Sequence, residues 1–323
     1  MGEILAHTFD GQHVWIKDKH QKSKTKIDAM FFPATAEKFD KNNLRAEKEF
    51  KKLPTFIMCN PNAMFYQNMI NYPHAFYLRF FLQKNINVLL WNYRGYARSK
   101  NKQCCQSMPS PENIREDSEA VLRFCRQDLG LRGKIGVYGR SLGGIATAHL
   151  AHYVDMVIVD RSFSNLYEVA YHKFHGFLAI LLFKLGTWGW DSNNDVRLFE
   201  RGIDSEERRK EIESKGFAPI AVAQGLSEPP QSVSQDEAPE PANKSCYKVV
   251  TCDVNDDIVI LQGSLMLGAA RRAAVAQQQN SSHYKERPLG IVDSKEATKL
   301  IETLDRLQEV DERLYHFVNA KIE

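Results

Sequence analysis

The stretch KIGVYGRSLGGIATAHLA (residues 134–151) places one serine, Ser141, among three glycines. Gly139 lies two residues before the serine, and Gly143 and Gly144 follow it at two and three residues. An apolar run precedes this cluster and an alanine- and leucine-containing run follows it, so we expect a strand, a tight turn and a helix. Small residues let such a turn hold its serine in a strained conformation that exposes the hydroxyl. The stretch predicts a nucleophilic serine, and the alternative is a glycine-rich turn with an incidental serine.

The rest of the chain repeats short apolar runs and longer helical patterns, which is typical of a mostly parallel sheet with helices on both faces. The opening runs 13–18 and 26–33 predict an antiparallel pair of strands. Further strands are expected at residues 55–59, 87–92, 134–139, 155–160 and 247–252. Helices are expected at residues 65–83, at 142–152, at 294–320 and after an N-cap at Ser110 with Pro111 in the first turn. We interpret residues 1–323 as a single α/β domain.

Two segments interrupt this pattern. Residues 163–200 are rich in aromatic and apolar side chains and predict a small helical cap over the carboxyl edge of the sheet. Residues 201–245 begin with a charged run that could form an exposed helix ended by Gly216. Their second half is rich in Pro, Ser, Gln and acidic residues, and it cannot bury enough apolar surface to order itself. We interpret 201–245 as a flexible, disordered insertion.

Composition excludes several classes of protein. With 43% hydrophobic and 26% charged residues the chain is typical of a globular protein, and a net charge of +3 gives no reason to expect nucleic acid as a partner. The six cysteines are scattered without metal-ligand spacing, so we expect free thiols and no metal. The longest apolar run, residues 177–183, is too short to span a bilayer. A soluble cytoplasmic protein is the expectation.

A serine nucleophile needs a histidine that removes its proton, and in this fold class the histidine comes last in the chain. Of the ten histidines, only His283 and His316 come late enough. His316 lies within the expected closing helix beside Tyr315 and Phe317, which is typical of a packing residue. His283 lies in the polar stretch NSSHYKER and is the better candidate for the base.

The acid that orients the histidine has several candidates. Asp253, Asp256 and Asp257 follow the expected strand 247–252, and Asp160 ends the strand before it. A carboxylate a few residues beyond a strand can fold back toward a histidine, so Asp256 fits best. Asp253 is the second choice and Asp160 the third.

The site also needs backbone donors for the oxyanion that forms during acyl transfer. One should be the N–H of Leu142, directly after the serine. The other should come from the loop after strand 55–59, where the N–H of Asn62 or Ala63 is available and Pro61 has none.

The order of five motifs resembles the eukaryotic α/β-hydrolase-domain-containing proteins. They are CNPNA (59–63), LLWNYRGYARS (89–99), VYGRSLGG (137–144), VDRSFSNL (159–166) and DVNDDIV (253–259). The similar branch contains protein depalmitoylases and lysophospholipid or monoacylglycerol lipases, and the resemblance covers about residues 50–320 apart from the insertion. It implies an α/β-hydrolase fold with Ser141 as nucleophile, Asp256 as acid and His283 as base. It also implies that Tyr93 to Tyr96 shape the site.

The chain departs from the family at two places. Asn60-Pro61 stands where relatives carry His-Gly, and His283 follows two serines in place of two glycines. The leading hypothesis is a cofactor-independent serine hydrolase that cleaves an ester or thioester of a lipid-like or protein-bound acyl group, with peripheral membrane contact as a further expectation. The alternatives are a catalytically inactive hydrolase fold used as a binding module and a peptidase of the same fold. The sequence does not indicate an oligomeric state.

Overall fold

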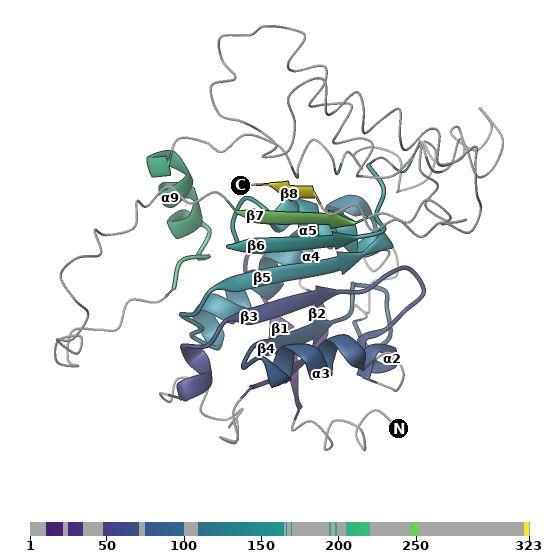
Figure 1. Cartoon of the computed structure of the whole chain (residues 1–323), viewed down its shortest axis with the longest axis horizontal. Coiled ribbons are helices and arrows are strands. Elements are labelled where there is room, and N and C mark those ends of the chain that lie inside the picture. The colour runs from purple at the N-terminus through teal and green to yellow at the C-terminus, as the bar shows by residue number, and fades with distance from the viewer. Residues whose placement is uncertain are drawn as a thin grey trace, which may run out of the picture.

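The computed structural model describes residues 11–21, 25–34, 48–70, 75–99, 109–164, 166, 169, 194, 198, 205–219, 246–251 and 320–322. Within these residues the chain forms an eight-stranded sheet in the order β1-β2-β4-β3-β5-β6-β7-β8 (Figure 1). The strands are β1 (Gln12–Lys17), β2 (Lys26–Phe32), β3 (Thr55–Cys59), β4 (Asn87–Trp91), β5 (Ile135–Arg140), β6 (Met156–Asp160), β7 (Tyr247–Thr251) and β8 (Ala320–Ile322).

The centre of the sheet is parallel. Strands β4, β3, β5, β6 and β7 pair in parallel, and Val137 of β5 lies between Ile57 of β3 and Val157 of β6. Strand β2 pairs antiparallel with both β1 and β4, and β8 is antiparallel to β7. The predicted strands and the opening antiparallel pair are confirmed. The carboxyl ends of the five parallel strands therefore share one edge of the sheet.

Helices cover both faces of the sheet, as predicted (Figure 1). One face carries α2 (Tyr66–Ile70) and α3 (Phe76–Gln83), and the other carries α4 (Pro111–Arg123) and α5 (Gly144–Leu150). Helix α4 begins as expected: the Oγ of Ser110 accepts a 3.1 Å hydrogen bond from the Asn113 N–H, and Pro111 follows the cap. A serine cap and a proline at the first position satisfy or remove backbone donors that a helix end leaves unpaired.

The core lies in two layers because alternate strand residues point to opposite faces. On β3, Ile57 and Cys59 pack toward α4 and α5, while Phe56 and Met58 pack toward α2 and α3. All five residues of β3 are buried, as expected for a strand covered on both faces.

Parts of the remaining predictions fall outside the described residues. In 163–200, only residues 163, 164, 166, 169, 194 and 198 are described, so the cap stays a prediction.

In 201–245, Ser205–Ser214 form helix α9 and Gly216 follows at a φ of 71°, which confirms the expected helix and its end. Residues 220–245 and 252–319 lie outside the described residues, and Ala320 begins β8. None of the helices in the described part of the chain has the length and hydropathy needed to cross a bilayer.

Candidate active site

Ser141 lies in the turn that joins β5 to α5. Strand β5 ends at Arg140, a short 3-10 turn covers Ser141–Gly143, and α5 begins at Gly144. The φ of Ser141 is 51°, in the left-handed region that a non-glycine residue rarely adopts. The side chain is partly exposed, whereas its neighbour Leu142 is buried. The structure thus has the strained strand–turn–helix arrangement that the sequence predicts, with its serine accessible.

Close packing requires glycine at two positions around this turn. A Cβ at Gly139 would overlap the Oγ1 of Thr147 and the carbonyl oxygen of Gly143. A Cβ at Gly143 would overlap the carbonyl oxygen of Cys59, the last residue of β3. The serine turn therefore lies directly against the end of β3, where the loop with the predicted oxyanion donors begins.

The turn is also fixed from the side of β6. The hydroxyl of Ser162 donates a 2.7 Å hydrogen bond to the carbonyl oxygen of Ser141. Ser162 is buried, and a Cβ at Gly144 would overlap its Oγ. The residues after β6 thus hold the carbonyl group of the strained serine.

The loop after β3 carries the second set of predicted donors. Asn60 is fully buried, and its Nδ2 donates to the carbonyl oxygen of Trp91 at 2.7 Å. Asn62 and Ala63 are exposed, and Ala63 has a φ of 57°. The Asn60 side chain therefore fastens this loop to the end of β4.

Two tyrosines from the loop after β4 also bind this loop. The hydroxyl of Tyr93 donates to the carbonyl oxygen of Asn60 at 2.5 Å, and the hydroxyl of Tyr96 donates to the Oδ1 of Asn62 at 2.7 Å. Burial raises the pKa of Tyr96, although the nearby backbone of Ala63 acts in the opposite direction. Tyr96 thus holds this loop through the Asn62 side chain, which sequence reasoning did not anticipate.

The loop after β4 is anchored in turn to α4. The Nε of Arg94 donates to the Oδ1 of Asp117 at 3.0 Å, and the backbone N–H of Arg94 donates to the Oδ2 at the same distance. Asp117 is fully buried, and burial raises its pKa against the opposing effect of Arg94. A buried carboxylate paired with a buried guanidinium in this way fixes the loop that carries Tyr93 and Tyr96.

A buried polar network lies on the other side of the loop. Asp28 of β2 is fully buried and accepts hydrogen bonds from the Nδ2 of Asn92 at 3.1 Å and the hydroxyl of Tyr66 at 3.1 Å. The Nε2 of His13 lies 2.7 Å from the Oδ1 of Asp28. Burial would raise the pKa of Asp28, but the hydrogen bonds from His13 and Asn92 outweigh it and lower that pKa. The one sequence signal for this site is an aspartate inside the apolar strand KIDAMFF.

The structure places the serine turn against Cys59, where the Asn60–Ala63 loop begins, but most of the other predicted site residues lie outside the described residues. These are Asp253, Asp256, Asp257, His283 and His316. Strand β7 ends at Thr251 and runs parallel to β6, so its carboxyl end lies at the edge of the sheet that holds Ser141.

Asp160, the third choice for the acid, lies within the described residues. It ends β6, and its Oδ2 accepts a 2.8 Å hydrogen bond from the hydroxyl of Tyr138. The Nε of Arg161 donates to the other oxygen at 3.2 Å. Its carboxylate is therefore held by a tyrosine of β5 and by the arginine that follows it.

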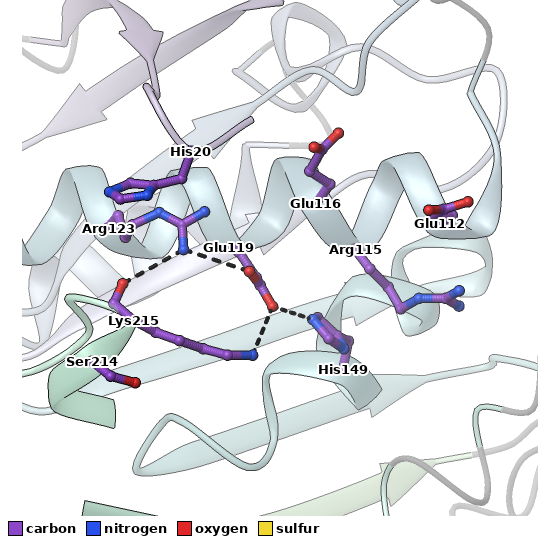
Figure 2. Close-up of a pocket in the computed structure, with 9 residues that line it drawn as sticks. All are labelled: His20, Glu112, Arg115, Glu116, Glu119, Arg123, His149, Ser214 and Lys215. Atoms are coloured by element: carbon purple, nitrogen blue, oxygen red, sulfur yellow. Dashed lines mark hydrogen bonds and ion pairs between the residues drawn. The ribbon is translucent and has the colours of Figure 1, made fainter. Parts of the chain in front are cut away.

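A groove of about 380 Å³ lies elsewhere, between α4, α5 and α9 (Figure 2). Glu119 at its centre accepts hydrogen bonds from the Nε2 of His149 at 3.0 Å and the Nζ of Lys215 at 3.3 Å. Burial would raise the pKa of Glu119, but His149 and Lys215 outweigh it and lower that pKa to about 2. These charged groups pair with one another and hold α9 against α4 and α5.

In the described part of the chain, no cluster of three or more His, Cys, Asp or Glu residues could hold a metal ion.

Comparison with known proteins gives weak sequence matches. No family model matches the chain. It is 24% identical over 127 residues to protein bem46 of Schizosaccharomyces pombe, a match that covers 38% of this chain and 40% of that protein. It is 28% identical over 95 residues to the uncharacterized membrane protein YNL320W of Saccharomyces cerevisiae, covering 28% of this chain and 31% of that protein. The chain thus spans less than half the length of these curated relatives.

Solved structures with a similar arrangement include two hydrolases. The Pyrococcus furiosus esterase Pf2001 matches with a TM-score of 0.40 and 16% identity, covering 57% of this chain and 63% of that chain. XC6422 from Xanthomonas campestris, a serine hydrolase without a lid, matches with a TM-score of 0.35 and 14% identity, covering 48% and 62%.

The topology of the chain itself identifies its fold. The strand order crosses over between β4 and β3, β2 is antiparallel to its neighbours, and the central strand β5 leads through a positive-φ serine into a helix. The nucleophile elbow of α/β hydrolases is a sharp strand-to-helix turn of this kind at the carboxyl edge of a mostly parallel sheet. The chain therefore has the α/β-hydrolase fold.

Proposed function

We propose that the chain is a serine hydrolase that cleaves acyl esters or thioesters, with Ser141 as its nucleophile. The observation that carries this proposal is the φ of 51° at Ser141, in a turn at the carboxyl end of β5. Strain of this kind is retained where the surrounding structure enforces it, and it is common at catalytic positions. Here Ser162 and the packing around Gly143 enforce it.

In the proposed reaction His283 removes the hydroxyl proton of Ser141 as the Oγ attacks the acyl carbonyl carbon. Asp256 orients His283 and stabilises its positive charge. The proton passes from His283 to the leaving alcohol or thiol, which leaves an acyl-serine. Water then attacks the acyl-serine as His283 takes its proton, and that proton passes to the Oγ of Ser141 as the carboxylic acid leaves.

The oxyanion of each tetrahedral intermediate requires two donors. We assign one to the N–H of Leu142. We assign the other to the N–H of Asn62 or Ala63 in the loop after β3. Tyr96 binds the side chain of Asn62, so it would position this donor.

The proposed substrate class is a lipid-like acyl ester or an acylated protein. Two sequence features support it: the apolar segment 163–200 and the resemblance to depalmitoylases and lysophospholipases. Rates of hydrolysis for p-nitrophenyl esters and acyl-thioesters of increasing chain length would test it. A maximum at short acyl chains would contradict the lipid-like substrate while leaving the hydrolase proposal intact.

A fluorophosphonate probe tests the nucleophile directly. The wild-type chain should become covalently labelled, Ser141→Ala should not, and Ser214→Ala should label as the wild type does. Ser214 is a matched control because it is an exposed serine on α9. Absence of labelling in folded wild-type protein would contradict the proposal and favour a hydrolase-fold binding module, for which the Asn60-Pro61 loop is the supporting feature.

Paired variants test the proton relay. Asp256→Asn and His283→Asn should each lower kcat by about a thousandfold or more. The matched controls Asp253→Asn and His316→Asn should retain activity within a few fold. If Asp253→Asn or Asp160→Asn is the inactive variant, the acid must be reassigned to that residue.

A further inference from the structure

Helix α3 has one buried face and one exposed aromatic face. Leu78 and Phe81 are buried against the sheet, whereas Phe76 is 66% exposed, Phe80 44% and Tyr77 37%. Phe76 and Phe80 lie one helical turn apart, and their rings stack with centroids 6.3 Å apart. We call Phe76, Tyr77 and Phe80 the aromatic face of α3.

This clustering is unusual for a protein surface. Single exposed apolar side chains are common, whereas contiguous exposed apolar patches often mark sites of contact with another surface. Five large apolar side chains in the described part of the chain are strongly exposed, and three of them form the aromatic face. The other two are Trp15 on β1 and Phe65 in the loop before α2.

Helix α3 and the residue that follows it carry only basic charges, on Arg79 and Lys84. In the sequence, the 62 residues from Phe50 to Pro111 contain eight lysines and arginines and no aspartate or glutamate. Of these cations, Lys51 and Arg94 are buried, and Arg94 is paired with Asp117. Arg79 lies on α3 among the aromatic residues, and Lys84 follows the helix; both are exposed. A second copy of the chain docked on this face would bring like charges together, whereas an anionic surface would complement them.

The aromatic face begins at the edge of the sheet that holds Ser141. Helix α3 leads into β4, which is parallel to β3, so the first residue of α3, Phe76, lies toward the carboxyl edge. Figure 1 shows α3 and α2 following one another across the same face of the sheet. Phe65, just before α2, packs edge-on against Tyr96 at 6.0 Å between centroids. The exposed aromatic residues thus extend to the loops beside Ser141.

We propose that the aromatic face of α3 docks the protein on the surface of a membrane that contains anionic lipids. Aromatic rings favour the boundary between headgroups and acyl chains, and Arg79 and Lys84 would meet lipid phosphates. Each cation near an anionic membrane surface strengthens binding by about fivefold. Docking in this orientation would turn the carboxyl edge of the sheet toward acylated substrates, and this last step rests on the proposed function.

Sedimentation with lipid vesicles tests the docking without any assay of activity. The purified full chain should bind vesicles of phosphatidylcholine with about one third phosphatidylserine, and bind pure phosphatidylcholine vesicles much less. Phe76→Ser/Phe80→Ser should lower the partition coefficient at least tenfold. Arg79→Gln/Lys84→Gln should remove the preference for phosphatidylserine and its sensitivity to salt.

Matched controls are available on other surfaces. Trp15→Ser removes an exposed aromatic ring from β1, and Arg209→Gln/Lys210→Gln removes two exposed cations from α9. Both should bind vesicles like the wild type. Because all substituted side chains are exposed, each variant should keep the melting temperature of the wild type within a few degrees, which circular dichroism checks.

Three outcomes would overturn the proposal. The wild type could remain in the supernatant with both vesicles, or Phe76→Ser/Phe80→Ser could bind as tightly as the wild type. Self-association in analytical ultracentrifugation that this double variant abolishes, without vesicle binding, would assign the face to a second copy. Ser141→Ala should bind vesicles normally, so failure of fluorophosphonate labelling would contradict the proposed function and leave the docking result standing.

Discussion

The hydroxyl of Ser162 donates to the carbonyl oxygen of Ser141 at 2.7 Å, and the same hydroxyl fills the space beside Gly144. The Ser162 side chain therefore fixes the serine turn. It also leaves no room for a side chain at position 144, the first residue of α5. Because a methyl group at position 144 would meet Ser162 first, the two positions should be energetically coupled.

We expect Gly144→Ala to lower the free energy of unfolding by about 1–3 kcal/mol through steric overlap with Ser162. Ser162→Gly removes the overlapping atoms, so the double variant should recover part of that loss. Urea denaturation of the wild type, both single variants and the double variant measures the coupling. Strictly additive effects would show that the overlap at Ser162 is not the cause.

Tyr96→Phe should lower kcat/KM about tenfold and leave the melting temperature nearly unchanged, because Tyr96 is part-exposed and its hydroxyl binds the loop of Asn62. Asn62→Ala should have a similar effect, and the two should not add. Tyr93→Phe should behave differently, because it removes the hydroxyl that donates to the buried carbonyl oxygen of Asn60. Leaving that carbonyl unpaired should lower the free energy of unfolding by about 1–3 kcal/mol. Ester hydrolysis and thermal melts on the same samples separate the two cases.

Asp28→Asn should destabilise the fold by about 2 kcal/mol or more at neutral pH, since a buried charged acceptor of several hydrogen bonds is lost. The pKa of Asp28 in the fold is lowered below its ordinary value of 3.8. The ionised Asp28 therefore contributes its full stabilisation of the fold above pH 3.8. This stabilisation is lost as the pH falls through the lower pKa that Asp28 has in the folded protein. Denaturation at several pH values should show the difference between wild type and Asp28→Asn shrinking below pH 3.8; a constant difference would contradict this account.

Glu119→Gln should loosen α9, because Glu119 binds both His149 of α5 and Lys215 behind α9. The pKa of Glu119 is lowered from 4.5 to about 2, so this contribution is complete above pH 4.5 and is lost as the pH falls toward 2. Hydrogen exchange of residues 205–219 should quicken in Glu119→Gln at neutral pH. Glu213→Gln, which breaks an exposed pair with Arg209, should change it little.

The sequence predicts the strands and the serine turn well because their signals are local. Apolar runs of five or six residues mark β3 to β7, and Gly139 to Gly144 mark the turn within six residues. Glycines are needed there because backbone and side-chain atoms of other residues lie against the turn. The cluster of glycines itself can be read from the sequence without any knowledge of those contacts.

The contacts that position the site are not local, and sequence reasoning missed them. Asp28 and Asn92 are 64 positions apart, and Arg94 and Asp117 are 23 apart. Nothing in either residue's neighbourhood specifies its partner, so only the three-dimensional fold reveals the pairs. Asp256 and His283 lie outside the described residues and stay predictions.

The segment 220–245 joins two points that the fold holds firmly. The Nε2 of Gln127 donates to the carbonyl oxygens of Gly216 at 2.9 Å and Ala218 at 3.3 Å, and Cys246 is buried just before β7. Both anchors lie toward the amino edge of the sheet, opposite Ser141. The sequence predicts a flexible connection here, and doubling the length of a flexible connection costs only about 0.6 kcal/mol in closure entropy. Evolution or an engineer can therefore lengthen, shorten or replace this connection, even with a whole reporter domain, without moving the serine turn.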